Sequence, residues 1–362
     1  FSASHAQENF RIGYDGSYSK ADNYTAGGDF KTSKVTGRAG HTLPLDEVGS
    51  SAYENINQTL SLAVQNADHM AELKGGEQQV PEELFPNQRM DMTDNTQKWV
   101  NLRTRSNFNW GELETGLYHE KADHSMDFGP DKRFWYGTAS GGPNGINGSG
   151  NGQPCSPIGP MCAAGMPMDS EGKTTGASLK ASIDLSPMDV LRVGSEYQRY
   201  RLNDYWDPSG AMMWPGTFDN INDGERDRAA LFSEWESQVA PDWLTLLGVR
   251  YENVRMDTGE VQGYGNMMGN QITEAAAFNA RDRSQTDHNW DATALAAWTV
   301  DNNLNVEFGF ARKVRSPNLY ERYTWSTWDM AAVMNNFAGD GNGYVGDIDL
   351  NPETAYTAST RF

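Results

Sequence analysis

The sequence predicts an all-β chain, and more specifically a transmembrane antiparallel β-barrel. Apolar and polar residues alternate with a period of two in many segments, and short turns alternate with long polar connections. Aromatic residues make up 11% of the 362 residues, and 37 residues are glycine. Because only every second residue of a barrel strand faces lipid, such strands contain no long apolar run. A mean hydropathy of −0.70 is therefore compatible with this fold.

The alternation is clearest in residues 304–315. Leu304, Phe308 and Phe310 fall on one face of this segment, whereas Glu307 and Lys313 fall on the other. The same period of two, which favours strand over helix, recurs in 60–64, 100–108, 113–118, 179–185, 243–254 and 290–298. With a strand at about 9–21 and another from 355, the pattern predicts five hairpins and about twelve strands.

Connection lengths indicate which ends of the strands lie together. Short turns are expected at 65–69, 109–111, 185–190, 238–243 and 300–304. Long polar connections are expected at 80–96, 124–176, 203–227, 256–289 and 316–354. Loops beyond about 15 residues are uncommon in compact domains, but outer-membrane barrels combine short periplasmic turns with long extracellular loops. A soluble β-sandwich also alternates; serial charges such as Arg103 with Arg105, or Glu234 with Glu236, favour a wet barrel lumen instead.

Composition excludes several function classes. A formal net charge of −20 repels phosphate backbones, so no nucleic-acid partner is expected. No apolar run approaches the ~20 residues of a spanning helix, and 11 tryptophans argue against disorder. The sequence contains no Gly-x-Ser-x-Gly elbow and no metalloprotease histidine pair, so we predict that it is not an enzyme and has no catalytic residues.

Two segments near the end of the chain resemble those of a known family. They are Ala-Arg-Lys-Val-Arg-Ser-Pro-Asn-Leu-Tyr-Glu-Arg-Tyr at 311–323 and Gly-Asp-Ile-Asp-Leu-Asn-Pro-Glu at 346–353. This pair is similar to the strand end and loop-closing turn of TonB-dependent outer-membrane receptors. The motif residues are Arg312, Arg315, Ser316, Pro317, Asn318, Leu319, Tyr320, Glu321, Asp349, Leu350, Pro352 and Glu353. Segments 43–48, 86–92, 118–126 and 339–346 resemble the copper-receptor branch of that family.

The resemblance implies a barrel of 22 strands, an N-terminal plug domain and energy from the inner-membrane TonB complex. Residues 1–362 are then expected to form a fragment of one barrel domain, with the plug and the C-terminal strands outside it. It also implies a multi-pass protein of a Gram-negative outer membrane, with lipid and lipopolysaccharide as neighbours. No cofactor is required, and copper is the expected transported ligand.

Methionines are concentrated in or beside the expected long connections, often in pairs. A thioether is a soft ligand that favours Cu(I), and imidazole binds either oxidation state of copper. The candidate metal ligands are Met90, Met92, His124, Met126, Met166, Met168, Met212, Met213, Met330 and Met334. The alternative is that these methionines fill apolar gaps between loops, beside tryptophans such as Trp206 and Trp325.

Cys155 and Cys162 are the only cysteines and flank a short Pro/Gly segment. Two cysteines this close in an oxidising compartment predict a disulfide that closes a small loop. The alternative is a pair of thiolate copper ligands acting with Met161 and Met166.

The leading hypothesis is therefore a receptor for copper or a copper complex. A receptor for a siderophore or another metallophore is the alternative within the same class. A passive porin, a surface adhesion barrel and a soluble secreted β-sandwich remain as hypotheses from other classes.

Overall fold

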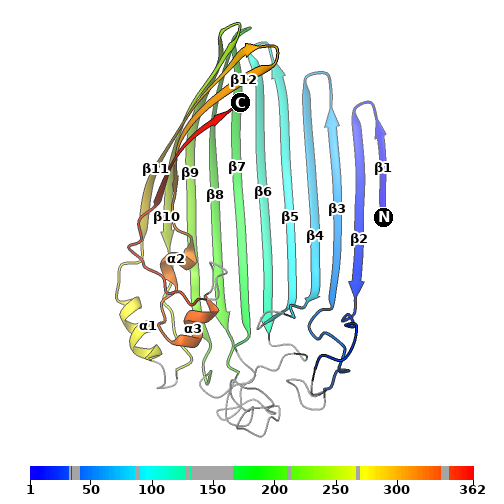
Figure 1. Ribbon diagram of the computed structural model, residues 1–362, viewed down its shortest axis with the longest axis vertical. Helices are drawn as coiled ribbons and strands as arrows, with labels where there is room; N and C mark the ends of the chain where they lie inside the picture. The colour runs from blue at the N-terminus through cyan, green and yellow to red at the C-terminus, as the bar shows by residue number, and fades with distance from the viewer. Residues whose placement is uncertain are drawn as a thin grey trace.

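The computed structural model describes residues 1–31, 34, 41–86, 90–127, 131, 166–209, 213–265, 270–335 and 342–362. Its described residues form one sheet of 13 antiparallel strands, in which each strand pairs with its neighbours in the chain. Figure 1 shows these strands as one strongly curved layer, from β1 at one edge to β13 at the other. The all-β prediction, with a partial barrel, is confirmed.

The strands are long enough to extend beyond a bilayer, which about 9–11 residues span. Their bounds are β1 Ser2–Gln7, β2 Phe10–Ala21, β3 Tyr53–Gln65, β4 His69–Glu83, β5 Asp91–Phe108, β6 Gly111–Asp127, β7 Met168–Ser186, β8 Asp189–Trp206, β9 Phe218–Ala240, β10 Trp243–Asp257, β11 Gln285–Asp301, β12 Leu304–Arg315 and β13 Glu353–Arg361.

All five expected short turns are present and lie together at one end of the sheet, the turn end (Figure 1). The prediction of about twelve strands missed β1, because its sequence Ser-Ala-Ser-His-Ala-Gln carries no apolar alternation. Residues 2–7 form a strand because their backbone pairs with β2, from Ser2↔Asp15 to Gln7↔Phe10.

The expected long connections were drawn too long. Strand β5 begins at Asp91 and β9 at Phe218, so parts of the segments 80–96 and 203–227 are strand. Beyond the bilayer neither face meets lipid, so the alternation of side chains disappears. Backbone hydrogen bonds between neighbouring strands continue there all the same, because they do not depend on side-chain polarity.

The two faces of the sheet differ in chemistry. On the outer face, Leu117, Leu179 and Leu231 are about half exposed, as lipid-facing residues of an isolated barrel wall must be. Aromatic pairs border this apolar band, with Trp243 stacked on Trp298 near the turn end. At the depth of this band the inner face instead carries ion pairs, such as those of Arg192 with Glu234 and Glu236 at 2.9 and 2.8 Å, as expected for a hydrated lumen.

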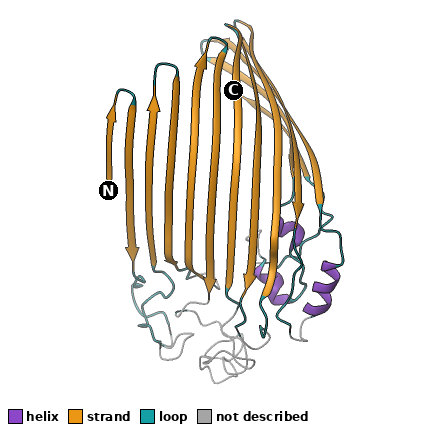
Figure 2. Ribbon diagram, turned by 180° about the vertical axis from the view of Figure 1, so that it is seen from behind, coloured by secondary structure: helices purple, strands orange, loops and turns teal. Residues whose placement is uncertain are grey.

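Three short helices cover the loop end of the inner face (Figure 2). They are α1 Gln271–Asn279, α2 Leu319–Tyr323 and α3 Asp329–Met334. Among the described residues, no helix has the length and apolarity needed to cross a membrane. Together with the described parts of 207–217, 258–284 and 316–352, these helices form what we name the loop cap.

The buried core lies under the loop cap and not in the middle of the sheet. Its centre is Phe218, whose ring stacks on Trp206 at 4.4 Å and on Trp325 at 4.8 Å between centroids. All three side chains are at least 94% buried. Because stacked aromatics bury large apolar areas, this cluster fixes the cap to strands β8 and β9.

Candidate metal site

Three predicted methionine ligands lie in one cross-strand row at the loop end. Met92 on β5 faces Met126 on β6, and Met126 faces Met168 on β7. Residues directly opposite in a sheet point to the same face, and neighbouring strands lie about 4.8 Å apart. The three side chains therefore emerge side by side on the inner face, where flexible thioethers can converge on one soft ion.

His124 stands in the adjacent row of the same face. It lies two residues before Met126 and is paired with Asn95 on β5 and Ser170 on β7. Its Nδ1 lies 3.2 Å from Asn95 Oδ1. When Nδ1 donates to this amide oxygen, Nε2 keeps the lone pair that a metal needs.

Burial sets the protonation state of this imidazole. Desolvation lowers the pKa of His124, and the charges of Asp169 and Asp94 only partly oppose it. The ring is therefore neutral at neutral pH. A neutral imidazole is the form that coordinates a metal.

The structure corrects the expected setting of these ligands. Met92, His124, Met126 and Met168 lie on paired strands and not in long connections. Met90 and Met166 each precede a strand by one or two residues and are more than 90% buried. A β-bulge between Met92 and Asp94 brings Met92 to the face that carries Met126.

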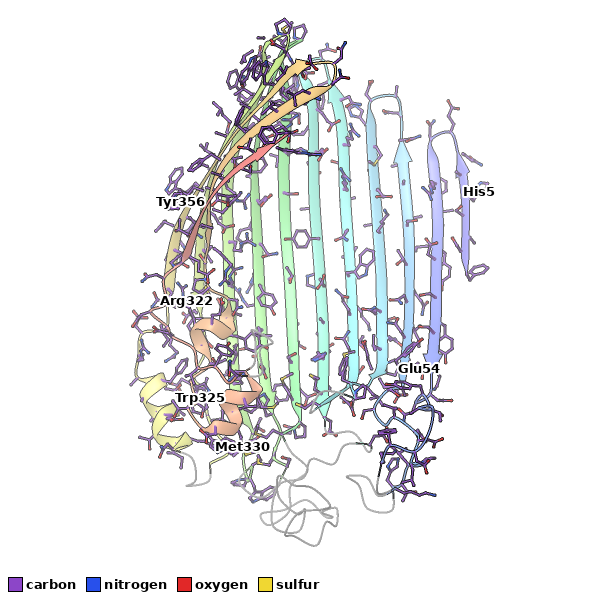
Figure 3. All side chains as sticks on the ribbon, in the orientation of Figure 1. His5, Glu54, Arg322, Trp325, Met330 and Tyr356 are labelled. Atoms are coloured by element: carbon purple, nitrogen blue, oxygen red, sulfur yellow. The ribbon has the colours of Figure 1, made fainter. Side chains whose placement is uncertain are left out.

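The other methionines fall into a second group. Met166 and Met213 belong to the aromatic core, and Met330 and Met334 pack against it, as Met168 of the cross-strand row also does. Figure 3 shows Met330 beside Trp325 at the loop end. These positions fit the packing role that was the alternative to metal binding. Met212, Cys155 and Cys162 lie outside the described residues.

A buried carboxyl close to the metal candidates was missed by sequence reasoning. Asp204 on β8 faces Ser170, which itself faces His124, and it is only 1% exposed. Trp206 Nε1 and Asn220 Nδ2 donate to it at 3.0 and 2.8 Å. Desolvation raises the pKa of Asp204 to about 6, although hydrogen bonds from Asn220, Tyr320 and Trp206 oppose the rise. Its position within a segment expected to be a loop hid it.

The family-motif residues form a structural clamp rather than a ligand site. Arg315 at the end of β12 makes two hydrogen bonds to Glu321, at 2.8 and 2.9 Å, and two to Glu353 of β13. The two carboxylates raise the pKa of Arg315 further. Asn318 caps α2 in a reciprocal capping box with Glu321. The motif therefore joins β12, α2 and β13.

The remaining motif residues continue this arrangement. Leu319 enters the aromatic core, Ser316 accepts a hydrogen bond from Asn289 at 2.8 Å, and Asp349 pairs with Arg281 at 2.8 Å. Arg322, which is 2% exposed and labelled in Figure 3, pairs with Asp287 at 2.9 Å and donates to the Leu350 carbonyl. Pro317 is buried beside Ser316, Arg312 contacts the Tyr356 ring, and Pro352 precedes β13.

Two further observations concern what the inner face could bind. Within the described ranges, no three His, Cys, Asp or Glu side chains are placed to hold one metal ion. A cavity of about 270 Å³ lies on the inner face nearer the turn end, lined by polar residues that include Tyr118, Gln198, Arg228, Arg250 and Glu252.

Comparison with known proteins resolves the fold family. The family model described as TonB dependent receptor-like, beta-barrel matches residues 3–360. This chain belongs to the TonB-dependent receptor family. The resemblance seen in the sequence is thus confirmed, and a comparison with curated protein sequences finds no match.

Solved structures of receptors share the fold at low sequence identity. The copper transporter OprC is 14% identical with a TM-score of 0.62, and the match covers 89% of this chain and 43% of that one. The hemophore receptor HasR of Serratia marcescens, a double mutant in complex with its hemophore HasA and heme, is 12% identical with a TM-score of 0.61 and coverages of 99% and 47%. The siderophore receptor PirA of Pseudomonas aeruginosa is 14% identical with a TM-score of 0.54 and coverages of 99% and 47%. This chain thus spans less than half the length of these receptors.

Proposed function

We propose that this receptor takes up copper, or a copper complex, across the outer membrane. The observation that carries the proposal is the row Met92, Met126 and Met168 with His124 beside it on the inner face. The likeness to the copper transporter OprC agrees with it, but at 14% identity that likeness concerns the fold.

The chemistry of the row suits a soft monovalent ion. Three thioethers and one neutral imidazole supply no negative charge, so a hard ferric ion gains little from them, whereas Cu(I) prefers such donors. Met92 is more than 90% buried, and Met126, Met168 and His124 are partly buried, which limits competition from water. In this proposal the row strips copper from a weak carrier and holds it at the wall of the lumen.

The partners follow from the same proposal. Outer-membrane lipid and lipopolysaccharide surround the outer face, and the TonB complex acts through a plug region outside these residues. A passive porin or an adhesion barrel needs neither a soft-metal row nor that energy input.

The test is Cu(I) binding to the full-length receptor, measured by competition with a chromogenic Cu(I) chelator. The double variant Met126→Leu/Met168→Leu keeps the apolar volume and removes two sulfurs. We expect its affinity to fall by about tenfold or more, since even indirect changes at metal sites cost 10–100-fold. Met188→Leu is the matched control, because Met188 is 62% exposed at the turn end. Unchanged affinity in the double variant overturns the proposal.

A ferric siderophore is the second candidate ligand. The observation that favours it is the polar cavity on the inner face, which is lined by Arg228 and Arg250. Both arginines pair with Glu252, so in this alternative an anionic chelate competes with that carboxylate for the two guanidinium groups. Its signature is tight binding of a ferric siderophore that Arg228→Gln weakens and Met126→Leu/Met168→Leu leaves unchanged.

A further inference from the structure

The row of thioethers on the inner face continues into the aromatic core. Ser170 on β7 faces Asp204 on β8. Two residues farther along these antiparallel strands, Met168 begins β7 and Trp206 ends β8, so both stand in the next row of the same face. Trp206 in turn faces Phe218 on β9. The row that begins with three thioethers therefore ends with two aromatic rings.

The indole of Trp206 has one face covered by a ring and the other turned toward the thioethers. It stacks on Phe218 with an interplanar angle of 7° and a centroid distance of 4.4 Å. Because neighbouring strands lie ~4.8 Å apart, a stack with this spacing runs across the strands, from β8 to β9. The opposite face of the indole is therefore directed toward β7, where Met168 packs against the same core.

Water is excluded from this end of the row. Trp206 is 0% exposed, and Met92 at the other end of the row is 8% exposed. A cation held by the thioethers therefore meets the face of an indole on its core side in place of water. Among aromatic side chains the indole attracts cations best, and the attraction increases when the pair is desolvated.

A buried carboxyl group strengthens the negative face of this indole. Trp206 Nε1 donates to Asp204 Oδ1 at 3.0 Å, and Asp204 is 1% exposed. A hydrogen bond from the ring N–H to a carboxylate moves electron density toward the ring, and a low local dielectric enhances such polarisation. The ring faces already carry the negative part of the aromatic quadrupole, so the bond makes them more attractive to a cation.

Packing alone accounts for only part of this arrangement. Contacts between sulfur and an aromatic ring are favourable in themselves, and they explain one methionine, Met168, at the border of the core. They give no reason for two further thioethers and an imidazole on the same face, from Met92, Met126 and His124. A soft cation gives a reason for all of them together.

We propose that the indole of Trp206 is part of the metal site and binds a soft monovalent cation through its π face, next to the sulfurs of Met126 and Met168. This inference rests on the proposed function, because it names a further binding residue of the same site. The indole face favours Cu(I), since Cu(II) prefers nitrogen and oxygen ligands in a tetragonal arrangement.

The first experiment measures Cu(I) affinity of the full-length receptor by competition with a chromogenic chelator. We expect Trp206→Leu to weaken binding about tenfold and Trp206→Phe to weaken it less, because a benzene face attracts cations less than an indole face. Trp325→Phe is the matched control. It removes an indole from the far side of the same stack, together with its hydrogen bond to the Asp219 carbonyl, and should leave the affinity unchanged. Equal affinity in the native receptor and both Trp206 variants overturns the proposal.

A spectroscopic measurement separates contact with the ion from a structural role of Trp206. Ag(I) serves as a redox-inert probe with the charge and softness of Cu(I). Saturation with Ag(I) is expected to change the tryptophan fluorescence of the native receptor and of Trp325→Phe equally. Trp206→Phe should lose most of that change. A change of the same size in Trp206→Phe overturns the proposal.

Fluorinated tryptophan keeps the test valid if the Trp206 variants do not fold, which circular dichroism establishes. Fluorine withdraws electron density from the ring face and nearly preserves its shape, so full replacement of tryptophan is expected to weaken Cu(I) binding severalfold. The same replacement should have no effect in Met126→Leu/Met168→Leu. Unchanged affinity in the fluorinated native receptor overturns the proposal. Binding that depends on the two methionines but not on Trp206 refutes this inference alone, whereas binding that depends on neither also refutes the proposed function.

Discussion

Protonation of Asp204 is expected to stabilise the loop cap. Its carboxyl is fully buried at the loop end of β8, beyond the apolar band, and its pKa is raised from 3.8 to about 6 by desolvation. A folded-state pKa above the unfolded one stabilises the fold fully below pH 3.8, and that contribution is lost as the pH rises through about 6. The shift corresponds to roughly 3 kcal/mol.

Asp204→Asn removes this titration and keeps a side chain of the same shape. The equilibrium constant for local opening of the native receptor, divided by that of the variant, is therefore expected to rise between pH 4 and 7. The rise is up to roughly 100-fold. Contributions of other titrating groups cancel in the ratio. The Asn amide has one acceptor oxygen where the carboxylate has two, so the variant loses one hydrogen bond. That loss changes the ratio by the same factor at every pH.

Hydrogen exchange at segment 318–324 of the full-length receptor is the assay, with protection corrected for the intrinsic rate at each pH. Within this segment of the loop cap the Thr324 N–H donates to the Tyr320 carbonyl, and the Gly346 and Asp347 N–H groups donate to the carbonyls of Thr324 and Glu321. Tyr320→Phe is the companion variant: it removes a hydrogen bond that lowers the pKa of Asp204, so the pH dependence should move above pH 6. A native-to-variant ratio that stays constant from pH 4 to 7 would refute the reasoning.

Two further predictions concern the metal row and the core. Burial lowers the pKa of His124, so Cu(I) affinity is expected to hold down to about pH 6.5 and to fall only on further acidification; competition titrations check this, and a His124→Gln variant with the same pH profile would contradict it. Phe218→Ala should destabilise the loop cap by about 3–5 kcal/mol, because its ring is fully buried between Trp206 and Trp325. Exchange in 318–324 should then rise while exchange in β6 stays unchanged, whereas unaltered protection of the cap would show that the stack is dispensable.

Alternation of side chains made the barrel and its turns predictable. Wherever lipid meets one face of a strand, the sequence must alternate, so segments such as 304–315 and all five short turns were found from residues alone. The same rule explains most of the failures. The outer parts of β5 and β9 lie where neither face is constrained by lipid, and they were read as loop. Strand β1 was left unassigned because its residues carry no apolar alternation, although it pairs with β2.

The residues of the candidate site were visible as chemistry but not as geometry. The soft donors Met92, Met126 and Met168 stand out in the sequence, and so does the motif around Arg315. The sequence could not separate methionines that share one row from those that, like Met213, fill the core under the cap. No pattern in the sequence marked Asp204, because its burial and its raised pKa depend on segments as distant as the one that carries Tyr320.

Residue types and their spacing by themselves determined the barrel class, the family and the soft character of the donor set. Strand register decided the rest. Because each strand adds one residue to every row, pairing over tens of residues along the chain placed three thioethers and the indole of Trp206 in one row of the inner face. Such rows arise from backbone hydrogen bonds between strands, and no local pattern in a single strand encodes them.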